Sequence, residues 1–527
     1  MPAFALDFGT SSTCIAVWDS SRGEAVPYPI EGWSRTVCSG DGNGVPVVPS
    51  LIHYSPGGER WIGRQVTEQG VLMQAGTFRW MKHYVGNRNP VLLPVNGRKI
   101  SYLQAGEDFL SAIIRSVAAE LGGVSADVAL TVPVEAFEHY ETWLGDVARR
   151  AGLPNYRIID EASAAALGYG ISIQPGHTYL VFDFGGGTLD IAMVRMEEGS
   201  EGGFPRCRVL GKAGEDFGGF MLDQWLYREV LRRCSLRDDD PGVAAISSRI
   251  LQACEQAKEV LSYADRATLQ IPTNASAHPA EVLVTLQEFE ELLEAHGLYT
   301  KLHAAIQRAI SNAIVRGYPE EEIRGVLMVG GSSAIPSVQK LLRQRFGQER
   351  VYFNRPFDAV ARGAAQFAAG TEVFDHIQHD YAVRHWNTRT HRYDYRVIIR
   401  KGTNYPEPEV ARITIRATHE GQRRMGIPIY EVGGSRSSYD GTIELVTDGN
   451  GGVRFVEIGL EDEERRSRFW MNEESPTFLT ADPPATPGEP RFELIFGIDG
   501  NKRLLLTSKD LQTGRLIHRL HPVIGLR

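Results

Sequence analysis

The sequence predicts an α/β protein built from two similar lobes and followed by an all-β domain. Three observations lead to this fold class. An Asp-Phe-Gly turn between apolar strands occurs twice, strands alternate with helices over the first 370 residues, and strand patterns dominate after Gly370. Alternating strands and helices favour mixed α/β layers, whereas a run of short strands favours a separate β domain.

The repeat is the strongest of these observations. Residues 7–12 (DFGTSS) precede the apolar run 15–17, and residues 183–188 (DFGGGT) precede the apolar run 191–192 at the same offset. Each copy has the pattern of a strand, a tight turn rich in Gly, Thr and Ser, and a second strand. A repeat with so large a period predicts two similar lobes that face each other, rather than a solenoid.

Strands and helices alternate around the two copies. We expect strands at 127–133, 158–160 and 326–329, and helices at 138–151, 162–167 and 250–261. Beyond Gly370 we expect strands at 395–399, 413–415, 443–446 and 492–498, separated by turn signals at 482–490 and 499–501. The domain prediction is therefore 1–370, a linker at 371–389, and a β-rich domain at 390–527.

Composition narrows the range of functions. The formal net charge of −9 disfavours nucleic-acid binding, which needs clustered Lys and Arg against phosphates. The five cysteines show no C-x-x-C spacing, which fits a reducing compartment. No targeting segment and no membrane-spanning run is found. We therefore expect a cytoplasmic protein that binds neither nucleic acid nor a membrane.

The two turns indicate phosphate chemistry. Phosphoryl transfer needs backbone donors around the phosphates, carboxylates that hold Mg²⁺, and a positioned water. The glycines of both turns allow a close approach to phosphate oxygens, and successive N–H groups form an anion-binding nest. Asp7 and Asp183 head the two turns. Both would therefore face one metal ion from opposite lobes.

Seven ordered motifs resemble the nucleotide-binding domain of heat shock protein 70 (DnaK-type) chaperones. They are DFGTSS, VVPS, LTVP, IIDEASAAALGYG, FDFGGGTLD, CEQAKEVLS and VLMVGGSSAIP, and they extend from residue 4 to about 370. The later segments VIIRKGTNYP, MGIPIYEV and FELIFGIDGN more faintly resemble the same family's substrate-binding β-sandwich. The resemblance implies a two-lobed actin-like ATPase domain before an all-β sandwich. No helical pattern follows Arg515, so we expect the family's helical lid to be absent.

The resemblance implies a chaperone-like protein that binds and hydrolyses ATP and binds exposed apolar polypeptide segments. Its cofactors would be ATP/ADP, Mg²⁺ and K⁺, and its partners unfolded or extended polypeptides and co-chaperones. One alternative is a regulatory module that uses nucleotide as a switch, with slow or lost hydrolysis. Another is a different actin-fold protein, such as a sugar kinase or a filament former.

Site residues follow from the match to the family's motifs. Lys82 falls at the catalytic lysine, although a solvated surface lysine is the alternative. The other expected catalytic residues are Glu161, Asp183, Thr188 and Asp190, and the expected metal-binding residues are Asp7 and Asp183. The expected nucleotide-binding residues are Gly9, Thr10, Ser11, Ser12, Gly185, Gly186, Gly187, Thr188, Gly218, Gly219, Glu255, Lys258, Ser262, Gly330, Gly331 and Ser332.

Several positions depart from the family's pattern. Glu259 and Ala334 stand where the family clamps adenine between two arginines, which puts base affinity and selectivity in doubt. Asp160 stands where the family has asparagine, and could either alter metal binding or cap the next helix. Glu141 stands where the family has an arginine that couples its two domains.

The β-rich region offers weaker signals. Met425 and Ile427 alternate with Ile429 and could line a peptide groove, or could fill the sandwich core. Four histidines near the linker, His376, His379, His385 and His391, could suggest a metal site, but a solvated linker with chance histidines explains them better.

Overall fold

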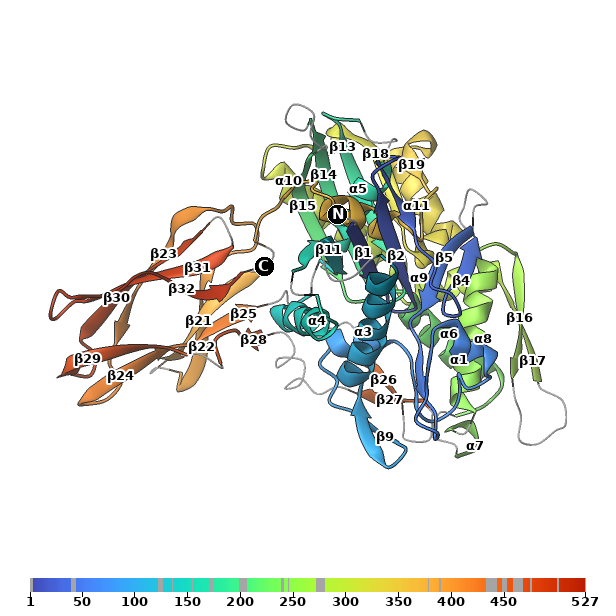
Figure 1. Cartoon of the computed structure of the whole chain (residues 1–527), viewed down its shortest axis with the longest axis horizontal. Coiled ribbons are helices and arrows are strands. Elements are labelled where there is room, and N and C mark those ends of the chain that lie inside the picture. The colour runs from blue at the N-terminus through green and yellow to red at the C-terminus, as the bar shows by residue number, and fades with distance from the viewer. Residues whose placement is uncertain are drawn as a thin grey trace. The chain divides into compact units, whose positions relative to one another are not determined.

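The computed structural model divides the chain into two compact units (Figure 1). The first comprises Met1–Ala136, Tyr140–Phe374 and Asp440–Ile458, and the second comprises Phe137–His139, Asp375–Tyr439 and Gly459–Arg527. The structure describes residues 3–38, 44–121, 127–134, 136–153, 155–170, 174–198, 206–237, 241–244, 246–271, 280–377, 379–387, 390–432, 443–447, 453–457, 468–473, 476–499 and 502–526. No helix within these ranges is both long and apolar enough to cross a membrane.

The first sheet of the first unit is built around the strand that leads into the first repeated turn. Strand β1 pairs antiparallel with β2 and parallel with β11, and β11 pairs parallel with β12. The full order is β12-β11-β1-β2-β5-β4, with β3 also paired to β2. The bounds are β1 Ala3–Phe8, β2 Ser12–Asp19, β3 Glu24–Pro27, β4 Arg35–Cys38, β5 Gly44–Pro49, β11 Asp127–Val132 and β12 Arg157–Asp160.

The second sheet repeats the core of this topology around the second turn. Strand β13 pairs antiparallel with β14 and parallel with β18, and β18 pairs parallel with β19. The full order is β19-β18-β13-β14-β15-β20. The two-lobed repeat predicted from the sequence is therefore confirmed. The bounds are β13 Thr178–Phe184, β14 Leu189–Glu197, β15 Arg206–Glu215, β18 Ile323–Val329, β19 Val351–Tyr352 and β20 Val373–Phe374.

Two helices of small residues, α5 (Glu161–Gly168) and α12 (Ala359–Ala368), pack against each other with their backbones almost in contact. A methyl group on Gly168 would lie 1.8 Å from the carbonyl oxygen of Ala359, and one on Gly363 would lie 1.7 Å from that of Ala164. Only hydrogen fits at both glycines. The Ala-rich sequence therefore reflects a close helix crossing, since larger side chains would separate the two helices.

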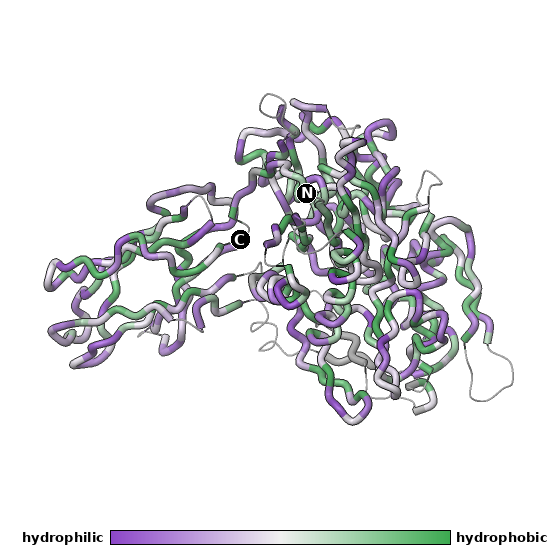
Figure 2. The backbone as a smooth tube through the Cα atoms, viewed as in Figure 1, coloured by the Kyte–Doolittle hydropathy of each residue, from purple (hydrophilic) through white to green (hydrophobic). Residues whose placement is uncertain are grey.

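Further helices and small sheets complete the first unit. Figure 2 shows hydrophobic residues running along its central strands. The helices are α1 Arg64–Glu68, α2 Met81–Gly86, α3 Tyr102–Glu120, α4 Glu138–Arg150, α6 Gly219–Arg233, α7 Pro241–Ala244, α8 Ser247–Leu261, α9 Leu286–Ala295, α10 Leu298–Ile314 and α11 Pro336–Phe346. The small sheets are β6 Ile52–Tyr54 with β7 Arg60–Ile62 and β8 Thr77–Phe78, β9 Leu92–Val95 with β10 Arg98–Ser101, and β16 Arg266–Ile271 with β17 Ala280–Thr285.

The second unit is all β, as predicted. One sheet has the order β22-β21-β25-β28 and another the order β23-β30-β31-β32, with the pair β24-β29 beside them. Their inward side chains form one core cluster that includes Tyr381, Ile429 and Phe492. The bounds are β21 Asp380–Asn387, β22 Arg392–Ile399, β23 Glu407–Arg416, β24 Gln422–Ile427, β25 Ile429–Val432, β28 Arg468–Trp470, β29 Thr477–Ala485, β30 Pro490–Ile498, β31 Arg503–Asp510 and β32 Leu516–Gly525.

Two local expectations differ from the structure. Residues 380–387, which we assigned to the linker, form β21, because Tyr381 and Val383 enter the core of the second unit. The segment 482–490 is not only a turn, since β29 continues to Ala485. Its prolines, Pro483 and Pro484, fall where the pairing register with β24 shifts, and there no ladder hydrogen bond is needed from them.

An extra hairpin lies between β25 and β28 in the sequence, and its first strand is the one expected at 443–446. Strands β26 (Ile443–Thr447) and β27 (Val453–Glu457) pair antiparallel. The hairpin groups with the first unit, although the chain on both sides of it belongs to the second.

Candidate functional site

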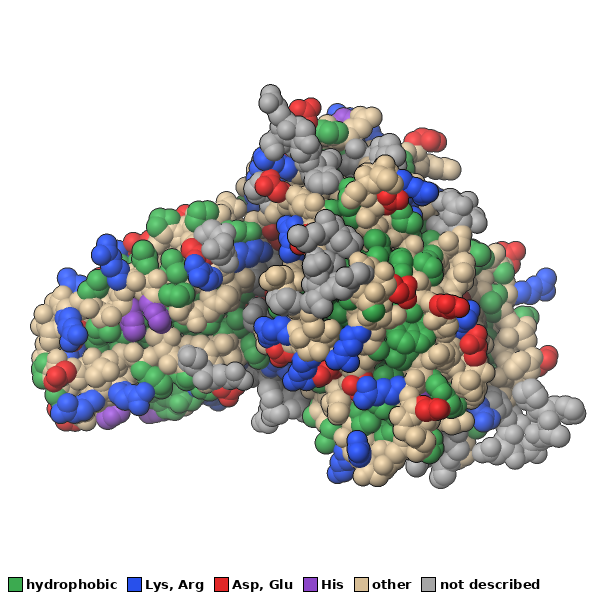
Figure 3. All heavy atoms as spheres, in the orientation of Figure 1, with side chains coloured by type: hydrophobic (Ala, Val, Ile, Leu, Met, Phe, Trp, Pro, Cys, Tyr) green, Lys and Arg blue, Asp and Glu red, His purple; other side chains and the backbone are tan. Residues whose placement is uncertain are grey.

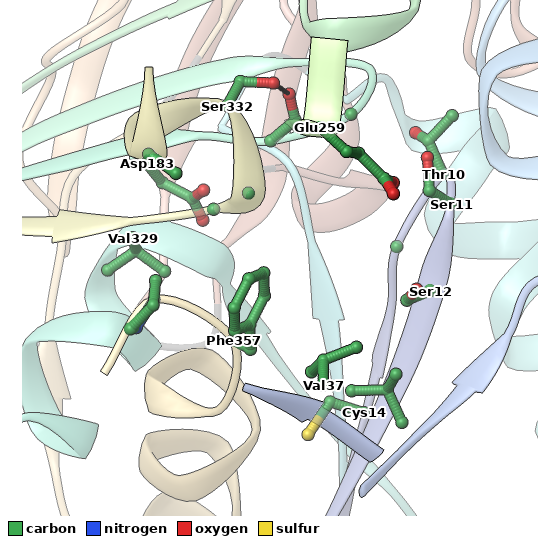
Figure 4. Close-up of a pocket in the computed structure, with 18 of the residues that line it drawn as sticks. Thr10, Ser11, Ser12, Cys14, Val37, Asp183, Glu259, Val329, Ser332 and Phe357 are labelled. Carbon is green, nitrogen blue, oxygen red and sulfur yellow. Dashed lines mark hydrogen bonds between the residues drawn. The ribbon is translucent and has the colours of Figure 1, made fainter. Parts of the chain in front are cut away.

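A cavity of about 500 Å³ lies where the two repeated turns meet. Its size is typical of a site for a small ligand. The turns contribute Thr10, Ser11 and Ser12 from one sheet and the residues 185–188 from the other. Figure 4 shows Asp183 and the first turn on different walls of this cavity.

The two turns approach each other closely enough to require glycine. A methyl group on Gly187 would lie 2.3 Å from Oγ1 of Thr10, and one on Gly186 would lie 2.8 Å from Oγ of Ser11. In the first turn, the hydroxyl of Ser50 donates a hydrogen bond of 2.7 Å to the carbonyl oxygen of Gly9. The hydroxyl-bearing turn therefore faces a run of three glycines, which have no side chains to fill the space between the turns.

A buried charge cluster forms the floor of the cavity. The ammonium group of Lys82 pairs with the carboxylate of Glu161, and Asp7 and Asp183 line the same cavity. Lys82 is only 6% exposed, so the alternative of a solvated surface lysine is wrong. Thr131 donates a hydrogen bond of 2.8 Å from its hydroxyl to Oδ1 of Asp7. The structure thus brings together four predicted residues from four separate segments.

The carboxylates of this cluster are held away from water. Burial raises the pKa of Glu161 to about 8, although Lys82 opposes the shift. Burial also raises the pKa of Asp7, and raises that of Asp183 well above its ordinary value with the help of the neighbouring Glu161 charge. For Lys82, burial alone would lower the pKa, but Glu161 raises it above the ordinary value. One lysine faces three acidic groups, so a bound cation would relieve the cluster.

Two further acidic residues have structural partners. Oδ1 of Asp190 accepts a hydrogen bond of 2.6 Å from the backbone N–H of Val134, directly after Pro133. Oδ1 of Asp160 caps α5 by accepting from the N–H of Ser163, and its Oδ2 pairs with Lys212 at 2.6 Å. Helix capping is therefore the role that the structure supports for Asp160.

Helix α8 and two glycine loops form the side of the cavity. The ammonium group of Lys258 donates to the carbonyl oxygen of Gly219 at 3.0 Å and pairs with Asp223 at 2.8 Å. The carboxylate of Glu255 pairs with Arg79 at 2.6 Å. The remaining predicted residues on this side are Ser262, Gly330, Gly331 and Ser332, which line the cavity, and Gly218 and Gly219, which pack behind the turn at 185–187.

The comparisons with known proteins agree with this arrangement. The model of the Hsp70 protein family matches residues 3–374. This chain belongs to the Hsp70 family. Chaperone protein dnaK3 of Thermosynechococcus vestitus is 28% identical over 541 residues, which cover 97% of this chain and 71% of that protein.

Two further relatives match over the same share of this chain. Chaperone protein dnaK3 of Synechococcus elongatus is 28% identical over 540 residues, with 97% of this chain and 65% of its own length covered. Chaperone protein DnaK of Thermus thermophilus is 27% identical over 549 residues, which cover 97% of this chain and 79% of that protein. The duplicated sheets are accordingly the actin-like fold of Hsp70 proteins, followed by their β-sandwich.

A magnesium ion fits the floor of this Hsp70 site by the chemistry of its donors. The described residues hold no group of three or more His, Cys, Asp or Glu placed to chelate a metal directly. Asp183, which is buried, and Asp7, which is partly buried, nevertheless line one cavity. Mg²⁺ keeps several water ligands and often needs only one or two carboxylates, so this pair suits it.

The end of the cavity beyond Lys258 departs from the expectation for the family. Glu259 and Ala334 both line it, as their positions in the sequence indicated. Three more residues line the cavity, Arg35, Tyr263 and Phe357, and the first two interact electrostatically with Glu259. None of the three was predicted from the sequence. No motif marks them, and Arg35 comes from β4, far from α8 in the sequence.

Two predictions outside the cavity need correction. Met425 and Ile427 are 4% and 1% exposed and belong to the core of the second unit, so they offer no surface to a peptide. They also lie on a different strand from Ile429, because β24 ends at Ile427 and β25 begins at Ile429. Filling the core, the alternative drawn from the sequence, is what the structure supports.

The linker histidines are not uniformly solvated. His376 and His379 are buried, whereas His385 and His391 are exposed. Within the described part of the chain they belong to no metal-binding group.

Proposed function

We propose that this protein binds ATP with Mg²⁺ in the cavity between the two turns and hydrolyses it slowly. The observation that carries the proposal is the buried Lys82–Glu161 pair beside Asp7 and Asp183, at the point where two glycine-containing turns meet. Phosphoryl transfer depends on positioning and on neutralising charge, which is what such a cluster can supply.

Each part of the site has a proposed role. The N–H groups and hydroxyls of residues 9–12 and 185–188 bind the β- and γ-phosphates. Asp7 and Asp183 hold Mg²⁺ through water, with K⁺ as a further ordering cation, and the metal neutralises phosphate charge. Lys82 stabilises the charge that develops on the γ-phosphate, while Glu161, Thr188 and Asp190 orient the attacking water. Glu255, Lys258, Ser262 and residues 330–332 bind the nucleoside.

Glu161 would work as a carboxylate that accepts a hydrogen bond from water. Burial raises the pKa of this carboxyl to about 8, so its ionised form depends on the positive charges beside it. A bound cation and the fixed Lys82 charge both favour the ionised form. Binding of the metal and nucleotide would therefore also prepare the residue for its role.

A chaperone role is supported by the Hsp70 family membership, and we propose extended polypeptide segments as the ligand of the second unit. The outward face of β21-β22-β25-β28 is aromatic and basic. Trp386 and Tyr393 are 42% and 57% exposed, with ring centroids 5.1 Å apart. On its visible side, Figure 3 shows hydrophobic and basic side chains interleaved over the second unit.

Arg384 lies at the centre of this face. Its guanidinium carbon is 4.6 Å from the ring centroid of Tyr393, 5.1 Å from that of Tyr430 and 5.3 Å from that of Trp470. Aromatic rings held by cation–π contacts are rigid and bind apolar side chains, while a guanidinium can donate hydrogen bonds to peptide carbonyls or carboxylates. Co-chaperones remain proposed partners without an assigned surface.

A nucleotide-switched module with slow or lost hydrolysis is the second candidate. It is favoured by the altered base end, with Glu259 and Ala334, and by Glu141 in place of a coupling arginine. This candidate predicts tight nucleotide binding without measurable turnover, whereas the first predicts turnover that depends on Lys82.

Single-turnover hydrolysis of ATP separates the two candidates. The comparison uses the unmodified chain, Lys82→Ala, and Lys340→Ala as a control at an exposed lysine of α11. We expect hydrolysis in the unmodified chain and the control, and at least roughly a hundredfold loss in Lys82→Ala. Equal rates in all three would refute the active-site proposal. Binding by calorimetry without turnover in any of them would favour the switch.

A further inference from the structure

The part of the cavity near Glu259 and Ala334, where the nucleobase would bind, supports a further inference. This inference rests on the proposed ATP binding and adds to it. From the sequence alone, the loss of two arginines predicts weak discrimination between bases. The structure adds three side chains, from β4, from the end of α8 and from the loop before α12. All three line the same cavity as Glu259 and Ala334.

An aromatic ring stands beside the position of one missing arginine. Phe357 is half-buried and points into the cavity (Figure 4). A methyl group added to Gly331 would lie 3.5 Å from Cε1 of Phe357, so the ring lies next to the loop that contains Ala334. Ala334, on the same short helix as Gly331, carries only a methyl group into the cavity lining. Base–aromatic stacking is favourable with any nucleobase.

A carboxylate stands at the position of the other missing arginine. Glu259 extends from α8 into the cavity from a different wall than Phe357 (Figure 4). Arg35 of β4 interacts electrostatically with Glu259, and Tyr263, one turn further along, lines the same end. The β4–β5 hairpin of the first sheet thus faces α8 across the cavity. A carboxylate can only accept hydrogen bonds, so it distinguishes bases by their donors.

We propose that the base of the nucleotide stacks on Phe357 and donates its exocyclic amino group to Glu259, which Arg35 holds in place. Adenine supplies such a donor. Hypoxanthine presents a carbonyl oxygen at the same position, which the carboxylate repels. The site would then favour ATP over ITP by a mechanism different from an arginine clamp, and the discrimination would depend on Glu259 while the general base affinity depends on Phe357.

Calorimetric titration with ATP, ITP and tripolyphosphate, each with Mg²⁺, tests this arrangement without relying on turnover. For the unmodified chain we expect ATP to bind roughly tenfold more tightly than ITP, the effect of one hydrogen bond to a charged group. Glu259→Gln should reduce this ratio to about one, because an amide both donates and accepts. Tripolyphosphate affinity should be the same in both proteins.

Two substitutions at Phe357 test the role of the aromatic ring. Phe357→Leu keeps an apolar side chain but removes the ring, and Phe357→Tyr keeps the ring. We expect Phe357→Leu to weaken ATP and ITP by a similar factor of roughly ten, and Phe357→Tyr to bind both nearly as well as the unmodified chain. Arg35→Ala should weaken ATP more than ITP, because Glu259 loses its positioning partner.

The outcomes separate this inference from the proposed function. If neither ATP nor tripolyphosphate binds, the nucleotide site itself is wrong. If ATP binds but ITP binds equally well, and Phe357→Leu changes neither affinity, the proposed base contacts are wrong while the phosphate site stands. If Glu259→Gln still binds ATP roughly tenfold more tightly than ITP, Glu259 is not the acceptor of the amino group.

Discussion

The two hairpins at the centre of the first unit share one backbone pattern but carry different side chains. In the first, Asp7 pairs with Cys14 across the strands; in the second, Asp183 pairs with Asp190. The first turn carries hydroxyls where the second carries glycines. The duplicated fold therefore places two similar turns at one cavity. The first turn fills the space between them with hydroxyl groups, and the glycines of the second turn leave room for those hydroxyls.

The largest expected effect tests whether both hairpins hold the metal. Asp7→Asn and Asp183→Asn should each slow ATP hydrolysis by roughly a hundredfold or more, because each removes one preorganised charge from the phosphate site. Single-turnover rates at several Mg²⁺ concentrations measure the loss. If one variant keeps the unmodified rate, the hairpins have diverged so far that only one of them binds the cation.

The next effect concerns the contact between the turns. Gly187→Ala places a methyl group 2.3 Å from Oγ1 of Thr10, whereas in Gly185→Ala the nearest atom is 3.6 Å away. We expect the first substitution to destabilise the fold by about 1–3 kcal/mol and the second to have a much smaller effect, since overpacking forces side chains and backbone to shift. Urea unfolding of both variants is the measurement. Equal stability would show that the turns do not touch in solution.

A pH effect follows from the acidic cluster. Glu161 has its folded pKa raised from 4.5 to about 8, so the folded state without ligand favours its protonated form. The contribution of protonated Glu161 to the free energy of unfolding is fully present below pH 4.5 and is lost as the pH rises toward 8. We expect the melting temperature of the nucleotide-free protein to fall over this window, and Glu161→Gln to flatten the fall.

Addition of ATP and Mg²⁺ provides the control for the pH experiment. Bound cations would stabilise the ionised carboxylates, so the fall in melting temperature should be smaller in their presence. A melting temperature that rises from pH 5 to pH 8 without ligand would contradict the raised pKa of the cluster.

The smallest effect concerns the thiol that replaces a carboxylate in the first hairpin. Burial and the neighbouring charges of Asp358 and Asp7 raise the pKa of Cys14 well above its ordinary value, while Cys38 is exposed. Alkylation at pH 8 should therefore label Cys38 at least roughly tenfold faster than Cys14, because the thiolate is the reactive form. Mass spectrometry of timed digests measures both rates. Comparable labelling would mean that the first hairpin opens readily to solvent.

Features carried by contiguous residues could be predicted from the sequence. The two Asp-Phe-Gly turns, the strands beside them and the Ala-rich helix depend on local patterns of glycine, apolar residues and helix formers, so their positions were clear from residues near each other in the chain. The predicted helix at 162–167 is α5, and Asp160 caps it through the N–H of Ser163. Capping depends on residues three positions apart, which a sequence displays directly.

Contacts between distant segments were decided only by the tertiary structure. Alternation predicts that Met425 and Ile427 share a face, but period two is the same for a core and for a groove, and only packing within the second unit buries them. Burial of Lys82 against Glu161, pairing of Lys212 with Asp160, and the meeting of Arg35, Glu259 and Phe357 all join segments far apart in the chain. The sequence by itself determined which chemical groups each turn and helix carries. The tertiary structure decided which of them face one another, because burial and charge pairing depend on distances that no local pattern specifies.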